Sequence, residues 1–355
     1  MKLKRKQNVL IILCTILIAF ILFQSNRVLA DTNVSYWNEG VKAQTRSGWM
    51  DWLPNEARVS QLSLPGTHDS MAWKPNLTGL DITRTQTMGL EDQLISGIRV
   101  IDIRVKYEET KFSCYHGPIY LGYDFDHVLK TIENFLRNNP TETVFMRFSQ
   151  ENSSASDEKM KMLFIDYYRK YENMFYKGRE RNPKVKDIRG KLVLFSNVWS
   201  LNPYGIDYRD LIKQDAYHLN TNWDLYSKWL KVKEHLNLAN NRQNKQDIYM
   251  NYLSGSGGSF PYFVASGKVS PQTWAGQLST GLTEPGFHNY YPDFPRGSWF
   301  GVFATIYFEG TNKLCSNYIE SQKPLYTGII MADFPGAQLI NNIIECNRGI
   351  QVIND

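Results

Sequence analysis

A histidine and a carboxylate are adjacent at His68-Asp69, just past a short run with the pattern of a β-strand. The run from Arg58 to Leu64 alternates polar and apolar residues, and Pro65-Gly66 is expected to end it. Imidazole titrates near neutral pH and can either accept or deliver a proton. The pair is therefore a candidate for acid–base chemistry in a loop at the C-terminal end of a strand.

Other strand-like runs also end at polar or ionisable side chains. These side chains are Arg104, His116, Glu151, Asn197 and Asp333, and Asp215 and Tyr217 lie at the start of a further run. In a parallel barrel the C-terminal ends of the strands converge on one rim, so residues far apart in the sequence can share a pocket.

Two histidines in one polar pocket suit a reaction in which one proton is removed and another is delivered. Asp69 and Asp333 are available to fix the tautomers of His68 and His116. Arg104 is permanently charged, and its planar set of donors suits a phosphate oxygen. The set indicates acid–base phosphoryl transfer with no cofactor and no obligatory metal.

Each candidate also has a simpler structural interpretation. His68 follows Pro-Gly and could be an ordinary loop residue, and Arg104 could form a structural ion pair with Asp102. Asp333 could belong to a turn that caps a helix beginning at Ala337. The remaining histidines have no comparable placement and are expected to be structural or at the surface; they are His127, His218, His235 and His288.

The order of the predicted elements indicates an α/β fold, a single distorted (β/α)8 TIM-type barrel. The strand-like runs are 58–64, 99–105, 111–115, 143–149, 191–197, 216–219, 247–253 and 327–332. Several are apolar nearly throughout, which is typical of parallel strands buried on both faces. Helical patterns cover 126–138, 157–171 and 222–238. A ninth β-like run, 300–308, could compete for the eighth strand or form a surface hairpin.

The N-terminus predicts a secretory signal peptide over residues 1–30, followed by one catalytic barrel domain over 31–355. Basic residues precede an apolar run from Val9 to Phe23, and Val28-Leu29-Ala30 places small residues at the −3 and −1 cleavage positions. The run is 15 residues long, whereas about 20 are needed to span a bilayer, so an uncleaved anchor is the weaker alternative. The expected location is therefore extracellular.

Removal of residues 1–30 takes five positive charges and lowers the formal net charge from +5 to zero. A nucleic-acid partner loses its compositional support, because it would need a persistent basic surface. Three cysteines remain, which allows at most one intramolecular bridge. Cys315 with Cys346 is the more plausible pair, because Cys114 lies in a strand-like segment near the candidate site. A chain of this length can also be stable without it.

Five motifs, in this order and spacing, closely resemble those of the secreted bacterial phosphatidylinositol-specific phospholipases C. They are Leu64-Pro65-Gly66-Thr67-His68-Asp69-Ser70, Gly97-Ile98-Arg99-Val100-Ile101-Asp102-Ile103-Arg104, Tyr115-His116-Gly117-Pro118, Asn139-Pro140-Thr141-Glu142-Thr143-Val144 and Met331-Ala332-Asp333-Phe334-Pro335. The resemblance runs from about Trp49 to the C-terminus. It implies a phosphatidylinositol diacylglycerol-lyase, a phosphorus–oxygen lyase acting on a membrane lipid.

The resemblance also implies residue roles. His68, oriented by Asp333, would take the proton of the inositol 2-hydroxyl, and the 2-oxygen would attack phosphorus to form inositol 1,2-cyclic phosphate. His116, together with Asp69, would protonate the departing diacylglycerol oxygen. Arg104 would bind a non-bridging phosphate oxygen, where calcium acts in the eukaryotic relatives. No metal is therefore expected.

For the headgroup, Glu151 and Asp215 match binding carboxylates of the family, and Tyr217 matches the aromatic residue that packs on the inositol ring. Two positions depart from the best-known members, which carry a lysine in place of Ser149 and, in some cases, an arginine in place of Asn197. These departures remove positive charge from the headgroup side of the pocket. They leave the residues of the core reaction in place.

Because the implied substrate lies in a bilayer, the expected partners are phosphatidylinositol and a peripheral membrane surface, with the enzyme a monomer. Trp73, Phe260 and Tyr262 are candidate membrane contacts, since aromatic rings suit the interface; barrel packing is an equal alternative for Phe260 and Tyr262. Two other functions stay open. They are a related secreted phosphodiesterase with a different headgroup, which would need a metal cluster, and a lipid-binding module without turnover.

Overall fold

The computed structural model describes residues 34–36, 44–74, 81–242, 244–269, 276–299 and 301–352. The chain divides into two compact units, Met1–Thr32 and Asn33–Asp355, and every described residue belongs to the second. The predicted signal peptide lies outside the described residues.

Eight parallel strands form the central sheet, and they follow one another around it in chain order. They are β1 (Leu64–Thr67), β2 (Val100–Glu108), β5 (Thr143–Gln150), β6 (Lys191–Ser196), β7 (Ile206–Asp207), β8 (Ile212–Gln214), β10 (Tyr249–Tyr252) and β15 (Ile329–Ala332). β1 pairs with both β2 and β15, so the first and last strands are neighbours. Within the described part of the chain, β7 and β8 are the end strands of this sheet path and are not paired with each other. The prediction of a distorted TIM-type barrel is confirmed.

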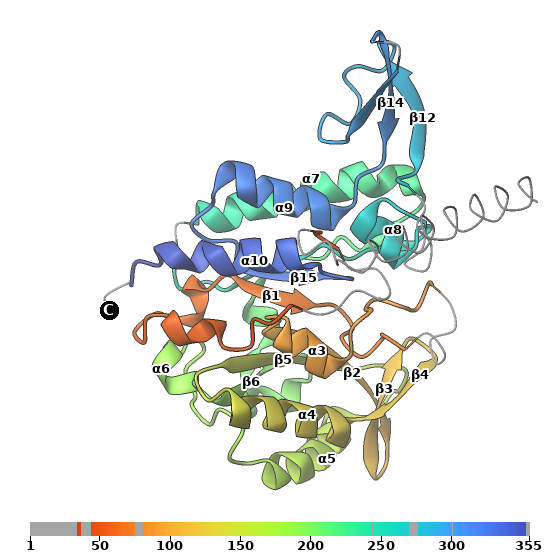
Figure 1. The fold of residues 1–355 in the computed structure, drawn as a ribbon. Coiled ribbons are helices and arrows are strands. Elements are labelled where there is room, and N and C mark those ends of the chain that lie inside the picture. Colours follow the sequence, from red (N-terminus) through yellow and green to blue (C-terminus); the bar gives the residue numbers. More distant parts are fainter. Residues whose placement is uncertain are drawn as a thin grey trace, which may run out of the picture. The chain divides into compact units, whose positions relative to one another are not determined.

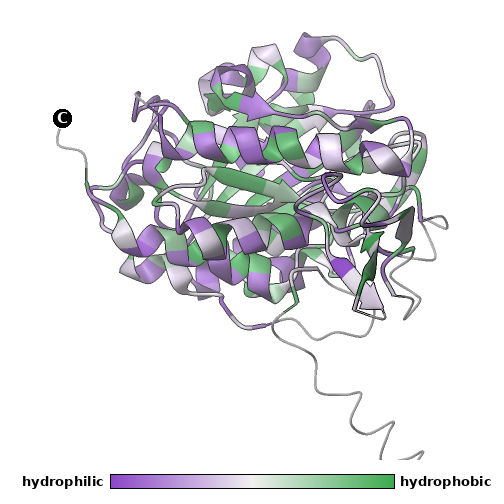
Figure 2. Cartoon of the chain, turned by 90° about the horizontal axis from the view of Figure 1, so that it is seen from above, coloured by the Kyte–Doolittle hydropathy of each residue, from purple (hydrophilic) through white to green (hydrophobic). Residues whose placement is uncertain are grey.

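Helices cover the outside of the curled sheet (Figure 1). They are α3 (Leu90–Ile95), α4 (Phe125–Asn138), α5 (Asp157–Lys170), α6 (Val185–Ile188), α7 (Leu225–Asn240), α8 (Pro261–Ser266), α9 (Thr311–Gln322) and α10 (Ala337–Glu345). The central strands are hydrophobic and the helices carry polar outer faces (Figure 2). The three predicted helices are confirmed as α4, as α5, and as α7 with the preceding 3-10 turn Asn222–Asp224. No helix in these ranges is long and apolar enough to cross a membrane.

Seven short strands lie outside the barrel path. β3 (Lys111–His116) and β4 (Ile119–Asp124) extend β2 as an antiparallel hairpin, and β9 (His218–Leu219) pairs with β11 (Ser256–Gly257). β12 (Ser279–Glu284), β13 (Arg296–Trp299) and β14 (Phe303–Tyr307) form a separate antiparallel sheet. The run 300–308 therefore belongs to a hairpin and not to the barrel.

Three of the predicted barrel strands were wrong. Residues 59–61 form a 3-10 helix, and the strand begins only at Leu64. The alternating pattern predicted a strand with its polar residues exposed, but Ser60 and Gln61 are buried. Ser60 Oγ donates to the Lys245 carbonyl at 2.6 Å, and Gln61 Nε2 donates to the Gln351 carbonyl at 2.7 Å. The predicted strands 111–115 and 216–219 lie outside the barrel. The two barrel strands that the sequence did not predict are β7 and β8, which are too short to show an alternating pattern of polar and apolar residues.

Pro65-Gly66 lies inside β1 and does not end it. A Cβ atom on Gly66 would lie 2.4 Å from Met331 Sδ and 3.0 Å from Val100 Cβ. The strand therefore passes so close to β15 and β2 that a side chain at position 66 would have to displace its neighbours.

The three cysteines of the barrel unit, Cys114, Cys315 and Cys346, are free in the structure, so the predicted Cys315–Cys346 bridge is not formed. Cys315 is fully buried, and Cys346 Sγ donates a hydrogen bond to the Asn342 carbonyl at 3.2 Å. The apolar core between the helices stabilises this region without a cross-link.

We expect Gly66→Ala to lower the free energy of unfolding by about 1–3 kcal/mol, because the added methyl group must displace Met331 or Val100. Urea unfolding followed by circular dichroism measures it. Gly48→Ala is the matched control, since a Cβ there would meet no atom within 4 Å. Equal stability of the two variants would contradict the tight packing of β1.

Candidate active site

Six of the predicted site residues line one cavity of about 220 Å³ at the C-terminal rim of the barrel: His68, Arg104, His116, Asp215, Tyr217 and Asp333. Thr85, Ser254, Gly255, Ser256 and Pro261 complete its wall. His68 and Asp333 directly follow β1 and β15, which are hydrogen-bonded neighbours. The pairing of the first and last strands thus brings together two side chains that are 265 positions apart.

His68 lies between the side chains of Asp333 and Arg104. Its Nδ1 is 2.8 Å from Asp333 Oδ1, and its Nε2 is 2.5 Å from Nη2 of Arg104. A guanidinium group can only donate hydrogen bonds, so Nε2 of His68 accepts one from Arg104. The ring proton is then on Nδ1, which donates a hydrogen bond to Asp333. Burial and the charge of Arg104 hold the pKa of His68 well below 6.5. The imidazole is therefore neutral at physiological pH, with its basic nitrogen on the Arg104 side.

The second histidine has a comparable arrangement. Nδ1 of His116 lies 2.8 Å from the Thr83 carbonyl oxygen and 3.2 Å from Asp69 Oδ2. The carbonyl can only accept, so Nδ1 carries a proton, and the shorter distance makes Thr83 the main partner. Burial raises the pKa of Asp69 to about 6, against the opposing effect of His116. Above that pH Asp69 is ionised.

Both loops that carry these acids contain a residue in the left-handed region: φ is 40° at Asp69 and 48° at Phe334, which follows Asp333. Such conformations are uncommon for residues other than glycine and concentrate at functional sites. The chain therefore turns sharply at the end of β1 and of β15.

Asp102 contacts more of the site than the sequence indicated, since the pattern suggested only a pairing with Arg104. It is fully buried, and its Oδ2 accepts Arg104 Nε at 3.1 Å and the backbone N–H of Asp69 at 3.1 Å. Its Oδ1 accepts Arg147 Nη1 at 2.6 Å. Burial by itself would raise the pKa of Asp102, but the two guanidinium groups hold it well below its usual range.

The signal for Asp102 and Arg147 was present in the strand patterns. Asp102 and Arg104 are two apart on β2 and so lie on the same face, and Arg147 is the register partner of Asp102 on β5. A charged residue on a strand face that otherwise points into a barrel needs a partner. Sequence pattern alone did not show that the partner lay on the neighbouring strand.

Glu151 lies beside the cavity and not in its wall. Its Oε1 accepts the backbone N–H of Gly117 at 2.8 Å, and its Oε2 is 3.9 Å from Nη1 of Arg104. It thereby ties the turn that follows His116 to Arg104.

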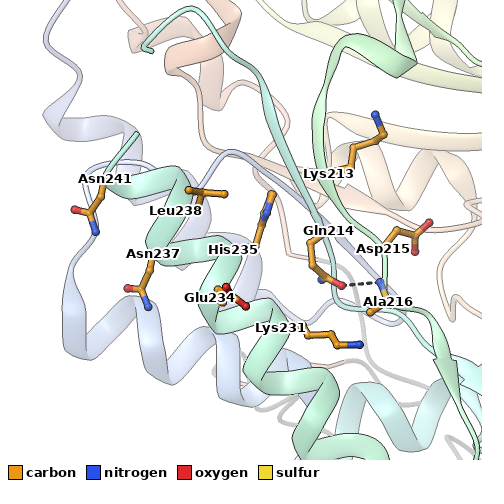
Figure 3. A pocket seen from close by; sticks show the side chains of 10 residues that line it. All are labelled: Lys213, Gln214, Asp215, Ala216, Lys231, Glu234, His235, Asn237, Leu238 and Asn241. Carbon is orange, nitrogen blue, oxygen red and sulfur yellow. Dashed lines mark hydrogen bonds between the residues drawn. The ribbon is translucent and has the colours of Figure 1, made fainter. Parts of the chain in front are cut away.

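The segment carrying Asp215 and Tyr217 is held from behind. Gln214 donates to Asn251 Oδ1 at 2.7 Å and accepts the Ala216 N–H at 2.7 Å, and Figure 3 shows Asp215 directed away from α7. Lys228 of α7 donates to the Tyr252 carbonyl at 2.7 Å, and burial lowers its pKa to about 7. Tyr217 itself is exposed at the cavity rim.

The three predicted membrane contacts have different environments. Phe260 is half-exposed, and Trp73 is partly buried and stacked on Tyr123. Tyr262 is fully buried and packs edge-on against Phe334, with ring centroids 5.1 Å apart. The surface role predicted for Tyr262 is therefore wrong, because α8 begins at Pro261 and all six of its residues are buried.

In the ranges that the structure describes, no group of three or more His, Cys, Asp or Glu side chains is arranged to hold a metal ion. The positive charge in the cavity comes from Arg104, whose Nε donates a hydrogen bond to the buried Asp102.

Known proteins share sequence features with this chain. Residues 62–197 match the family model of the phosphatidylinositol-specific phospholipase C X domain. The chain is 29% identical to a 1-phosphatidylinositol phosphodiesterase of Listeria monocytogenes over 97% of this chain and 98% of that protein. It is 28% identical to the 1-phosphatidylinositol phosphodiesterase of Staphylococcus aureus strain Newman, over 61% of this chain and 78% of that protein.

Solved structures agree with the fold. The phosphatidylinositol-specific phospholipase C of Listeria monocytogenes superposes with a TM-score of 0.61 at 27% identity, covering 85% of this chain and 99% of that one. A variant of the Staphylococcus aureus enzyme superposes with a TM-score of 0.61 at 21% identity, covering 85% of this chain and 98% of that one, which supports the fold alone.

Replacing Arg104 by Gln should raise the pKa of His68, since the nearby positive charge disfavours the protonated imidazole. NMR titration of the His68 ring protons measures it. Lys111→Gln, half-exposed at the start of β3, is the charge-matched control. An unchanged or lowered His68 titration midpoint in the Arg104 variant would contradict the arrangement.

Proposed function

We propose that this chain cleaves phosphatidylinositol to diacylglycerol and inositol 1,2-cyclic phosphate, because residues 62–197 match the X domain of phosphatidylinositol-specific phospholipases C and nearly the whole chain is similar to a bacterial 1-phosphatidylinositol phosphodiesterase. The observation that carries this proposal is the pair of imidazoles on one cavity, each beside its own buried carboxylate. One imidazole is poised as a base and the other as an acid.

The reaction begins at His68. Its Nε2 takes the proton of the inositol 2-hydroxyl, and Asp333 stabilises the imidazolium that forms. The 2-oxygen attacks phosphorus, the bond from phosphorus to the glycerol oxygen breaks, and His116 delivers a proton to that oxygen. One proton is thus removed and one supplied, and diacylglycerol leaves as a neutral alcohol.

Arg104 links the two halves of the reaction. In the absence of substrate its Nη2 donates to His68 Nε2, the same nitrogen that must accept the substrate proton. Binding of the phosphate gives the guanidinium a charged acceptor, so Nη2 exchanges the imidazole for a non-bridging oxygen and frees the base. Asp102 keeps the guanidinium within reach through Nε during this exchange.

Headgroup recognition falls to the opposite wall of the cavity. Asp215 accepts hydrogen bonds from ring hydroxyls, and the exposed Tyr217 offers a flat face for the ring. Glu151 braces Arg104 and the turn after His116.

We propose that the protein is secreted after removal of residues 1–30 and acts at a membrane surface. Basic residues followed by the apolar run Val9 to Phe23 and by Val28-Leu29-Ala30 support export. Exposed aromatic side chains on the segments that follow the barrel strands support surface binding. They include Tyr120, Trp199 and Phe260.

His68→Ala should lower the release of inositol cyclic phosphate from phosphatidylinositol vesicles by at least about 10²–10⁴-fold, the usual contribution of a general base, with vesicle binding nearly unchanged. Product chromatography and vesicle sedimentation measure the two effects. His127→Ala, an exposed histidine at the start of α4, is the matched control. Retained turnover in the His68 variant would overturn the mechanism.

Chelation should leave the reaction unaffected, because Arg104 supplies the positive charge at the phosphate. We expect equal turnover of phosphatidylinositol with EDTA and with added calcium, measured by chromatography of the products. Phosphatidylcholine and a glycosylphosphatidylinositol-anchored protein, assayed alongside, define the headgroup range. Loss of most activity in EDTA would contradict the role of Arg104 and favour a metal-dependent phosphodiesterase.

A further inference from the structure

The antiparallel sheet of β12, β13 and β14 projects away from the helices of the barrel unit (Figure 1). At its tip, β13 ends at Trp299, and Val302 and Phe303 lead into β14. Val302 is 69% exposed, and Trp299 and Phe303 are 43% and 42% exposed. Hairpin tips are ordinarily polar, so an apolar tip held in water indicates a binding surface.

The tip is also free of charge. From Gly297 to Thr305 the sequence contains no Asp, Glu, Lys, Arg or His. Trp299 and Phe303 form the last cross-strand pair, with their rings stacked at a centroid distance of 4.7 Å. Transfer of such a segment into a lipid interface removes apolar area from water without desolvating an ion.

The base of the sheet is anchored in the core. Ile306 on β14 is fully buried and packs in the cluster that contains Phe294 and Phe308. The guanidinium of Arg296 donates to Glu284 Oε1 at 3.0 Å and to the Tyr290 carbonyl at 2.6 Å, which ties β12 to the loop before β13. The tip is therefore presented by a preorganised element, and its insertion costs little conformational entropy.

The pocket between β8 and α7 is one hollow of the described surface where the tip of a second copy could dock. Its wall carries several charged and polar side chains (Figure 3). They include Lys213, Asp215, Lys231, Glu234 and Asn237. Burying Trp299 and Phe303 against these groups would desolvate charges without pairing them.

We propose that the β13–β14 tip inserts into the interface of a lipid bilayer and is a membrane anchor of this protein. The inference deepens the proposed function, because an enzyme whose substrate is a membrane lipid must dock on a bilayer. Aromatic rings suit the headgroup level, where an apolar body is buried and a polar edge stays wet. The anchor lies outside the catalytic cavity and adds to the aromatic side chains at the barrel rim.

The test is vesicle binding by Val302→Asp. Its side chain points mostly into solvent, so the fold should tolerate the change, whereas a carboxylate at the interface opposes insertion. We expect binding to phosphatidylcholine vesicles that lack phosphatidylinositol, measured by sedimentation, to weaken about tenfold or more. Leu325→Asp is the matched control: Leu325 is 70% exposed and lies between α9 and the start of β15, at the edge opposite the cavity.

Unchanged vesicle binding in Val302→Asp, or equal weakening in Leu325→Asp, would overturn the anchor. So would a wild-type dimer that Val302→Asp dissociates without affecting vesicle binding, because the tip would then be a self-association surface. Hydrolysis of a water-soluble short-chain phosphatidylinositol should be unchanged in Val302→Asp. If the wild-type chain fails to hydrolyse that substrate, the proposed function fails, while the vesicle result still decides the anchor.

Discussion

The buried carboxylate of Asp102 is the constraint around which the site is built. A charge inside a barrel is costly unless it is paired, and Asp102 meets that cost with two guanidinium groups and the backbone N–H of Asp69. Each contact also fixes another group: Arg104 is aimed at His68, and the loop that bears His68 is held against β2. Removing both arginines would leave the buried carboxylate without a cation, and an uncompensated buried charge costs about 3–5 kcal/mol.

The order of the barrel strands brings the other groups of the site together. β1 lies between β2 and β15, so His68 at its end meets Arg104 on one side and Asp333 on the other. Asp69, one residue later, turns through a left-handed conformation toward His116. Adjacent residues thus serve different imidazoles, because the chain reverses direction between them.

The proposed function at a membrane imposes a second, opposite demand. The cavity needs buried ions in fixed positions, whereas the surface around it needs apolar side chains exposed to water. The structure separates the two: the ionic network lies inside the barrel rim, and the exposed aromatic groups lie on loops and on the β13–β14 tip. Tyr262 shows that residue type alone does not separate the two demands. A tyrosine suits a membrane interface, but Tyr262 lies on α8, which places it in the core.

The sequence by itself determined the elements whose patterns are long and the motifs that bear the chemistry. The helices α4, α5 and α7 and the apolar strands β6 and β15 follow from local periodicity, and His68, Arg104, His116 and Asp333 follow from their positions at strand ends. Only the tertiary structure decided the strand identity of Leu64–Thr67, the partnership of Asp102 with Arg147, and the burial of Tyr262. These depend on contacts between distant segments, and a local pattern of polar and apolar residues cannot report which neighbouring strand a side chain will face.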